Sequence, residues 1–563
     1  MSSGVASERG NGVAGTDGDG PTITVPPTLE GVAAGLSHLS AALETTGPAR
    51  SHPSMRGRPP ALELGAELSI PDAVRDDVPE TGIELHVPPE LDYLFVVAPL
   101  AYYLGAEVKL DAHGPPRLFV PETGIECRFR ELPTFQHGVG RVLRRVFFLD
   151  SLVREHAPPA RRGELLDQFG LDAERMRALR SVERLGEYFW LADADLDEHL
   201  PEWQFSTYAD PEMENVQCLP DLLDSLSLVY LPEATELGEP DLLDRALTDF
   251  YRSGSPTRQP VQSVDVLDPE LQAGQVHGWL AAGTPIDAFK MTPRAVENRR
   301  TYERRHDGAD ELDVTVVLND DAMREEHAAV ADIYRERAAD RPLSVTVRER
   351  LTTRELADVF ATPTDFVHYI GHCDRDGLAC PDGRFSAATL DTCEARTFFL
   401  NACGSYHEGT ELVERGSVGG AVTLSKVLDE QAAKVGTAFA RLLVHGFGLE
   451  PAMQLARRRV MMGKDYAVVG DGTYTLTAPE QTPVVGWLET RTDGYELTCE
   501  AAPTRRTGGT FQSPCGDTSY LTGTAATQSL DTGELTEILA ESDFPVVYGG
   551  DFHWSSELVD SLD

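Results

Sequence analysis

The sequence predicts an α/β protein whose main domain is a mostly parallel sheet flanked by helices. From Glu311 onward, short β-favouring runs alternate with helical patterns of ten or more residues, as in the βαβ units of parallel sheets. The strands expected in order are "LDVTVVLND", "LSVTVRERL", "DFVHYIGH", "RTFFLNAC" and "SVGGAVTLS". The segments between them are long enough to cross over and cover both faces of the sheet.

Composition divides the chain into four expected regions. Residues 1–60 are rich in Gly, Ser, Pro and Thr, which predicts a mostly disordered arm with one helical stretch from Leu29 to Glu44. Residues 61–305 mix helix and strand patterns without a chemical motif, so they predict an α+β or α/β region of unknown role. Residues 306–475 carry the alternating pattern. Residues 476–563 return to strand patterns, which predict a small β-rich region.

The charge balance limits the kinds of partner. The 563 residues include 92 acidic and 49 basic side chains, a net charge of -43, and five of the basic residues are lysines. This composition resembles that of cytosolic proteins from salt-adapted microbes, in which carboxylates keep the surface hydrated. We therefore expect a halophilic, cytoplasmic protein. Nucleic acid is not expected as a partner, because phosphate binding needs clustered cations.

Membrane and disulfide patterns are both weak. The longest apolar run, from Leu94 to Ala106, is too short to span a bilayer, and the N-terminus has no pattern of a secretory signal. Eight cysteines in so long a chain do not form a disulfide framework, so reduced thiols are expected. The sequence implies no cofactor.

Two of the predicted strands end in residues that carry chemistry. His372 closes "DFVHYIGH", and Cys403 closes "RTFFLNAC". Ligands of open α/β sheets bind at the carboxyl ends of the strands, and a short right-handed crossover makes these two strands neighbours. A histidine beside a cysteine generates the thiolate and then protonates a leaving amine. The alternative interpretation is that His372 and Cys403 only pack at the strand ends and have no catalytic role.

The same segments resemble a known family. "VHYIGHCDRDGL", then "FFLNACGS", then "GGAVTLSKVLDEQAAKVGTAFARLL" resemble the CHAT domains of the caspase–separase clan of cysteine peptidases, over roughly Glu311 to Thr475. The resemblance implies a caspase-like fold with His372 as catalytic histidine and Cys403 as nucleophile. It also implies that His368, inside the third strand, is not catalytic. A protease effector in stress or defence would follow, acting on a protein or peptide and regulated through the N-terminal region.

Cys373 departs from the family pattern, which has glycine after the histidine. The resemblance implies an oxyanion hole formed by the backbone N–H groups of Cys373 and Cys403. Cysteine retains that N–H, so the hole survives if position 373 has negative φ, whereas a requirement for positive φ would strain the loop.

Two other functions remain open at this stage. One is a catalytically inactive caspase-like scaffold that binds partners. The other is a zinc-dependent hydrolase, because five possible ligands lie close together in the sequence: His372, Cys373, Cys380, Cys393 and Cys403. The spacing lacks the close C-x2-C pairs of structural zinc sites, which disfavours the metal.

Charged residues near the site suggest two further hypotheses. A peptidase that cleaves after Arg or Lys needs a carboxylate near Cys403, and the candidates are Asp429, Glu430 and Glu408. The basic run "NRRTYERR" within residues 296–310 is interpreted as a solvated helix face or linker, with self-processing as the alternative.

Overall fold

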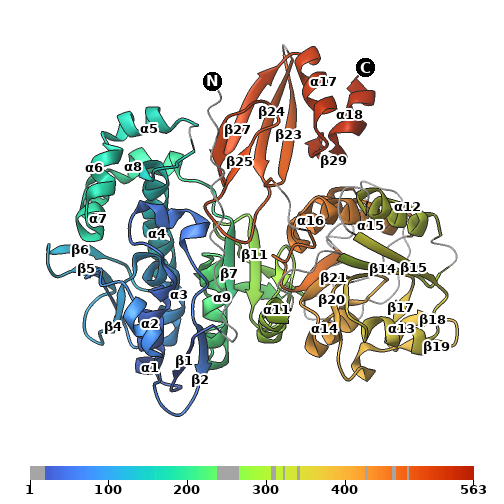
Figure 1. Cartoon of the computed structure of the whole chain (residues 1–563), viewed down its shortest axis with the longest axis horizontal. Coiled ribbons are helices and arrows are strands. Elements are labelled where there is room, and N and C mark those ends of the chain that lie inside the picture. The colour runs from blue at the N-terminus through green and yellow to red at the C-terminus, as the bar shows by residue number, and fades with distance from the viewer. Residues whose placement is uncertain are drawn as a thin grey trace, which may run out of the picture.

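The computed structural model describes most of the chain. The described residues are 20–158, 160–236, 266–305, 312–320, 324–338, 343–424, 429–459, 465–477, 481–492 and 494–562. Figure 1 shows a blue-to-green N-terminal lobe, a yellow-to-orange lobe beside it, and a red C-terminal region above their junction.

A ten-stranded sheet joins the two lobes. Its spatial order is β15 (Leu343–Glu349), β14 (Leu312–Leu318), β16 (Thr364–Ile370), β20 (Ala395–Asn401), β21 (Gly419–Thr423), β22 (Tyr466–Gly470), β13 (Phe289–Lys290), β11 (Val276–Leu280), β7 (Phe205–Ala209), β8 (Leu228–Tyr230). Every neighbouring pair is parallel except β21–β22. The sheet therefore consists of two parallel halves that run in opposite directions, and the predicted mostly parallel α/β fold is confirmed.

Helices cover both faces of the first half of this sheet. Successive side chains of a strand point to opposite faces, and accordingly Val316 and Val317 of β14 belong to different hydrophobic clusters. The helices of one face are α12 (Arg324–Ala338), α15 (Asp429–Val444) and α16 (Leu449–Ala456), and those of the other are α11 (Pro293–Arg305), α13 (Thr353–Phe360) and α14 (Tyr406–Arg415). This arrangement leaves the strand ends free for a site.

The N-terminal lobe is folded from its first described residues. β1 (Thr22–Val25) pairs in parallel with β2 (Ala61–Leu64), and α1 (Leu29–His38) buries Val32 and Leu36. The prediction of disorder is therefore wrong for residues 20–60, where a few apolar side chains suffice to anchor a polar segment. Residues 1–19 lie outside the described residues.

The remaining N-terminal elements surround two long helices. α3 (Leu91–Leu104) is buried along most of its length, and α4 (Thr134–Val153) packs against it. The others are α2 (Asp72–Asp77), α5 (Arg162–Phe169), α6 (Ala173–Ala178), α7 (Ser181–Trp190), α8 (Asp193–Leu196), α9 (Leu219–Asp224), and a four-stranded sheet of β4 (Glu107–Leu110), β3 (Glu84–Val87), β5 (Arg117–Val120) and β6 (Ile125–Arg128). β9 (Ala234–Glu236), β10 (Val266–Pro269) and β12 (Thr284–Pro285) form a small sheet beside them.

The large sheet crosses the expected boundary at residue 305. Strands β7, β8, β11 and β13 come from the region expected to be separate, and β13 pairs with β22 through Lys290 and Val469. The two regions therefore share one sheet.

The C-terminal region is a second, mostly antiparallel sheet with two helices. Its strand order is β27 (Ala525–Leu530), β24 (Gly494–Ala501), β23 (Val484–Arg491), β28 (Pro545–Tyr548), β29 (Asp551–Trp554), with β25 (Thr510–Gln512) paired to β26 (Ser519–Leu521), and with α17 (Thr532–Glu541) and α18 (Ser555–Leu562). Within the described ranges, every helix is too short or too polar to cross a bilayer.

The basic run of α11 is partly buried. Arg299 is 4% exposed, and its guanidinium contacts Asp221 and Asp471 at 2.5 Å each. Asp471 follows β22 and Asp221 lies in α9, so Arg299 links the two lobes. The interpretation of this run as a solvated face or linker is wrong for Arg299. A peptidase also cannot reach this residue in the folded chain.

Two thiols in the C-terminal region are coupled. Cys499 of β24 and Cys515, between β25 and β26, share a hydrogen bond that lowers the pKa of Cys515 to about 7 and raises the pKa of Cys499. Because the thiolate is the reactive form, we expect Cys515 to be alkylated with a half-maximal rate near pH 7. A pulse of iodoacetamide at several pH values, followed by peptide mapping, measures this.

Cys499→Ala is the control for this prediction. It removes the hydrogen-bond donor, so the midpoint for Cys515 should move toward the ordinary cysteine value of about 8.5. A midpoint that stays near 7 in Cys499→Ala would show that the pair does not set the reactivity. Cys393 should react slowly throughout because burial raises its pKa to about 11.

Candidate active site

Three neighbouring strands place three polar residues at the same level. Leu318 of β14 pairs with Ile370 of β16, and Ile370 pairs with Asn401 of β20. Asp320, His372 and Cys403 each lie two residues beyond this row. Backbone bonds continue the row past the strands, from Asn319 N–H to Ile370 O (3.0 Å) and from Gly371 N–H to Asn401 O (3.4 Å). The carboxyl edge of the sheet thus brings a carboxylate, an imidazole and a thiol onto adjacent strand ends.

His372 and Asp320 are in direct contact. The distance from His372 Nε2 to Asp320 Oδ2 is 2.5 Å, and the His372 side chain is 56% exposed while that of Asp320 is 18% exposed. A carboxylate on Nε2 holds the proton there, which leaves Nδ1 as the basic nitrogen of the neutral ring. His372 is therefore oriented by the protein and open to solvent.

The backbone around Asp320 and His372 is held by Asn319. Its side-chain amide donates to Ala379 O (3.0 Å) and Leu351 O (3.1 Å), and its oxygen accepts from Leu351 N–H (2.8 Å). Ala379 N–H in turn donates to His372 O at 2.8 Å. Asn319 therefore joins the end of β14 to the hairpin that follows His372. These bonds fix the backbone next to Asp320 and His372.

Cys403 lies in a tight turn between β20 and α14. The turn needs Gly404, whose φ of 71° is in the left-handed region that favours glycine. Ser405 is buried and fixes the turn, because its hydroxyl donates to Leu400 O (2.9 Å) and accepts from Thr423 N–H (3.1 Å). α14 begins at Tyr406, so the positive end of a ten-residue helix lies next to the thiol. Cys403 itself is half-buried.

Cys373 has an extended backbone. It opens β17 (Cys373–Asp374), which pairs with β18 (Gly377–Cys380), and β18 pairs with β19 (Gly383–Phe385). The strain that a left-handed position would impose is thus absent. Burial, followed by the charges of Glu408, Asp374 and Cys403, raises the pKa of the Cys373 thiol to about 12. This thiol stays protonated at neutral pH and does not compete as a nucleophile.

Of the three carboxylates expected to face a basic substrate, the structure describes the side chain of one. Glu408 lies in the first turn of α14, is buried, and accepts a hydrogen bond from Ala387 N–H at 2.5 Å. Burial raises its pKa. Asp429 and Glu430 open α15, but their side chains lie outside the described residues.

The other candidate ligands and His368 contact residues of the protein interior. Cys380 accepts from Asn319 Nδ2 at 3.5 Å, and Cys393 lies 3.2 Å from Ser417 Oγ. His368 is fully buried against Phe399. Among the residues that the structure describes, no three His, Cys, Asp or Glu side chains are grouped closely enough to hold a metal ion. The zinc hypothesis therefore gains no support from the geometry.

No protein-family model and no curated protein matches this chain. Among solved structures it is similar to the Arg-specific cysteine proteinase gingipain R (RgpB), at 10% identity over 53% of this chain and 84% of that one, with a TM-score of 0.34. It is also similar to the complex of Porphyromonas gingivalis RgpB pro- and mature domains, at 9% identity over 44% and 71%, TM-score 0.27. The Saccharomyces cerevisiae separase–securin complex matches at 10% identity over 55% of this chain and 20% of that chain, TM-score 0.27.

These likenesses are loose, and at such TM-scores they decide nothing about activity. The fold description rests on the strand order and register given above.

Asp320 is the residue of the site that the sequence did not indicate. It ends "LDVTVVLND", a strand neighbouring the one that leads to His372. An acidic residue at a strand end is a usable signal in most proteins. In a chain with 92 acidic residues, one more acidic residue at a strand end does not stand out.

Proposed function

We propose that this chain is a cysteine endopeptidase of the CHAT type, with Cys403 as nucleophile and His372 as general base and acid. One observation carries the proposal: Asp320, His372 and Cys403 lie two residues beyond a single paired row of three adjacent strands. His372 is already bonded to Asp320. A nucleophile, a base and a group that orients the base are what acyl transfer requires.

In the proposed reaction, the proton of Cys403 passes to His372 and the thiolate attacks the peptide carbonyl. The tetrahedral oxyanion accepts hydrogen bonds from the backbone N–H groups of Cys373 and Cys403. His372 then gives its proton to the leaving amine, and the carbon–nitrogen bond breaks to leave a thioester. Water, deprotonated by His372, hydrolyses the thioester and restores the thiol.

Two features of the site support the roles of its residues. The N-terminus of α14 follows Cys403 closely, and the positive end of a helix favours a thiolate. Asp320 acts as a positioning residue, because its contact with His372 fixes the ring and stabilises the imidazolium that forms during attack.

The test is proteolysis of a peptide library by the purified full chain in concentrated salt, with cleavage sites read by mass spectrometry. Wild type and the matched thiol control Cys515→Ser should cut the same bonds, and Cys403→Ala should cut none. Cleavage that survives in Cys403→Ala would contradict the proposal. A chain that cuts nothing in any form is the result expected of an inactive scaffold.

We expect a preference for Arg or Lys at P1, with Asp429, Glu430 and Glu408 as the candidate carboxylates. Matched peptides that differ only at P1 measure it. If Glu408 contributes, Glu408→Gln should lower kcat/KM for an Arg peptide by about tenfold, since a charge-assisted contact becomes a neutral one, and leave a Leu peptide unchanged. Wild-type preference for acidic or apolar P1 residues would contradict the expectation.

The wider role follows from the same proposal. A peptidase in a chain of this charge would work in the cytoplasm of a salt-adapted cell, as an effector in stress or defence. Its substrate would be a protein or peptide, and a regulatory partner would bind the N-terminal lobe.

A further inference from the structure

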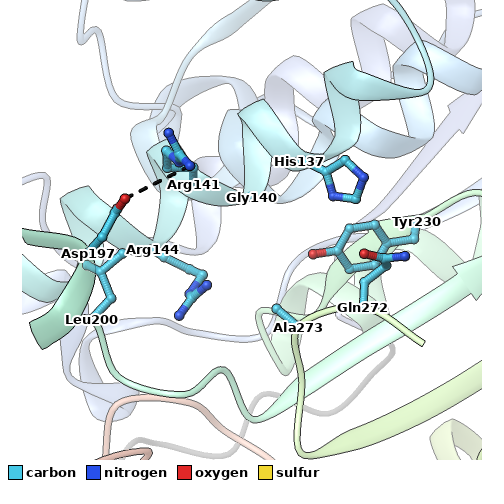
Figure 2. A pocket seen from close by; sticks show the side chains of 9 residues that line it. All are labelled: His137, Gly140, Arg141, Arg144, Asp197, Leu200, Tyr230, Gln272 and Ala273. Carbon is cyan, nitrogen blue, oxygen red and sulfur yellow. Dashed lines mark ion pairs between the residues drawn. The ribbon is translucent and has the colours of Figure 1, made fainter. Parts of the chain in front are cut away.

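The N-terminal lobe contains a cavity that the proposed reaction does not use. This cavity of about 340 Å³ opens between α4, the end of β8 and the segment that precedes β11. His137, Arg141 and Arg144 line it from successive turns of α4, and Tyr230 lines it as the last residue of β8. Figure 2 shows the Arg144 guanidinium and the Tyr230 hydroxyl turned toward the same hollow.

The cavity is more cationic than the protein around it. Among the described residues, two arginines, a histidine and one carboxylate, that of Asp197, line it. Asp197 pairs with Arg141 at 4.0 Å. In a chain with a net charge of -43, a pocket with an excess of cations is unusual and attracts anions.

The Arg144 guanidinium is part-buried, and the protein satisfies only some of its N–H groups. Its Nη2 donates to Pro201 O at 3.1 Å, while its Nε–H is buried without an acceptor in the described part of the chain. Burial lowers its pKa, and this outweighs nearby Tyr230, Asp197 and Glu202, which act in the opposite direction. A guanidinium that lines a cavity is stabilised when an oxyanion arrives there, since Arg binds carboxylate and phosphate through paired N–H groups.

The other walls are preorganised for a polar ligand. Tyr230 stacks on Tyr208 with 5.7 Å between ring centroids, which fixes its direction. Burial raises the pKa of Tyr230 to about 12, so its hydroxyl stays protonated and donates. Gln272 is held by a bond from its backbone N–H to Tyr208 Oη, and it lines the same cavity as Tyr230. The volume falls within the range of small-molecule sites, about 300–1,000 Å³.

We propose that this cavity binds a small organic anion through one oxyanion group, a phosphate or a carboxylate, held by Arg144 and the Tyr230 hydroxyl. The rest of the ligand lies along the Tyr230 and His137 side of the cavity. The proposal concerns binding alone and holds whether or not the chain is a peptidase.

The experiment is calorimetric titration of the full chain at constant ionic strength with inorganic phosphate, adenosine monophosphate and citrate. We expect saturable binding of at least one of them. Arg144→Gln should weaken it by about tenfold or more, the effect of losing a charge-assisted hydrogen bond. Tyr230→Phe, which removes one oxygen and keeps the ring, should weaken it less. Arg128→Gln, a change of an exposed arginine of β6, is the matched control and should bind as wild type does.

The three ligands separate the two chemistries. Tighter binding of adenosine monophosphate or phosphate assigns a phosphate ligand, and tighter binding of citrate assigns a carboxylate. The absence of binding by all three, or binding weakened equally by Arg128→Gln and Arg144→Gln, would overturn the proposal. Folding of each variant is checked by circular dichroism, and Tyr230→Phe keeps the test valid if Arg144→Gln does not fold.

Discussion

Cys403→Ala is expected to remove all peptide hydrolysis while the chain stays folded. The substitution deletes one sulfur from a half-buried turn, and Gly404 and Ser405 hold that turn. His372→Ala should lower kcat by about 10²–10⁴-fold, the usual contribution of a general base. The double variant should be no slower than Cys403→Ala, because the two residues act as one unit. Steady-state kinetics on the best peptide from the library give these values.

Asp320→Asn is the informative companion to these variants. It keeps the size of the side chain and loses the charge that contacts His372. We expect kcat to fall by at least about tenfold with little change in KM, because a group that orients the base acts mainly in the transition state. Asp332→Asn, a change of a largely exposed carboxylate on α12, should leave both parameters unchanged. Equal kinetics for Asp320→Asn and wild type would remove Asp320 from the mechanism.

The second large effect is expected on stability. Arg299→Met should destabilise the junction of the lobes by about 3–5 kcal/mol, because it removes the arginine that pairs with the buried carboxylate of Asp471. Asp221 also loses this partner but keeps Arg300 and Arg58. Arg294→Met is the matched control on the same helix: Arg294 is largely exposed and pairs with Glu297, so its loss should cost less than about 1 kcal/mol. Denaturant unfolding followed by fluorescence compares the two. Similar midpoints for both variants would show that the buried contacts do not hold the lobes together.

The same cluster predicts how stability depends on pH. Burial raises the pKa of Asp221 and Asp471, and the nearby arginines, Arg299 first, more than reverse this, so both folded-state values are lowered. A carboxyl group with a depressed pKa contributes stability that is fully present above its unfolded value, about 3.9. That stability is lost as the pH falls through the folded-state pKa. Acid should therefore destabilise wild type more steeply than Arg299→Met below about pH 4.

The sequence predicts those site residues whose place at the end of a strand follows from the local hydrophobic pattern. His372 and Cys403 end apolar runs in a βαβ series, and parallel pairing then makes their strands neighbours. Asp320 ends a strand in the same way, but its type is too common in this chain to stand out. The burial of Arg299 could not be predicted, because its partners Asp221 and Asp471 are 78 and 172 residues away. The fold of residues 20–60 depends on contacts with β2 and α3, which composition does not reveal.

Labelling of Cys403 by a peptide that carries a thiol-reactive electrophile tests the catalytic assignment most directly. The chain should carry Cys515→Ser, because the lowered pKa of Cys515 would otherwise give a second reactive thiol. Our account predicts one adduct, on Cys403, that is lost in His372→Ala and slowed by a competing peptide substrate. Adducts spread over the accessible thiols and unchanged by His372→Ala would contradict it.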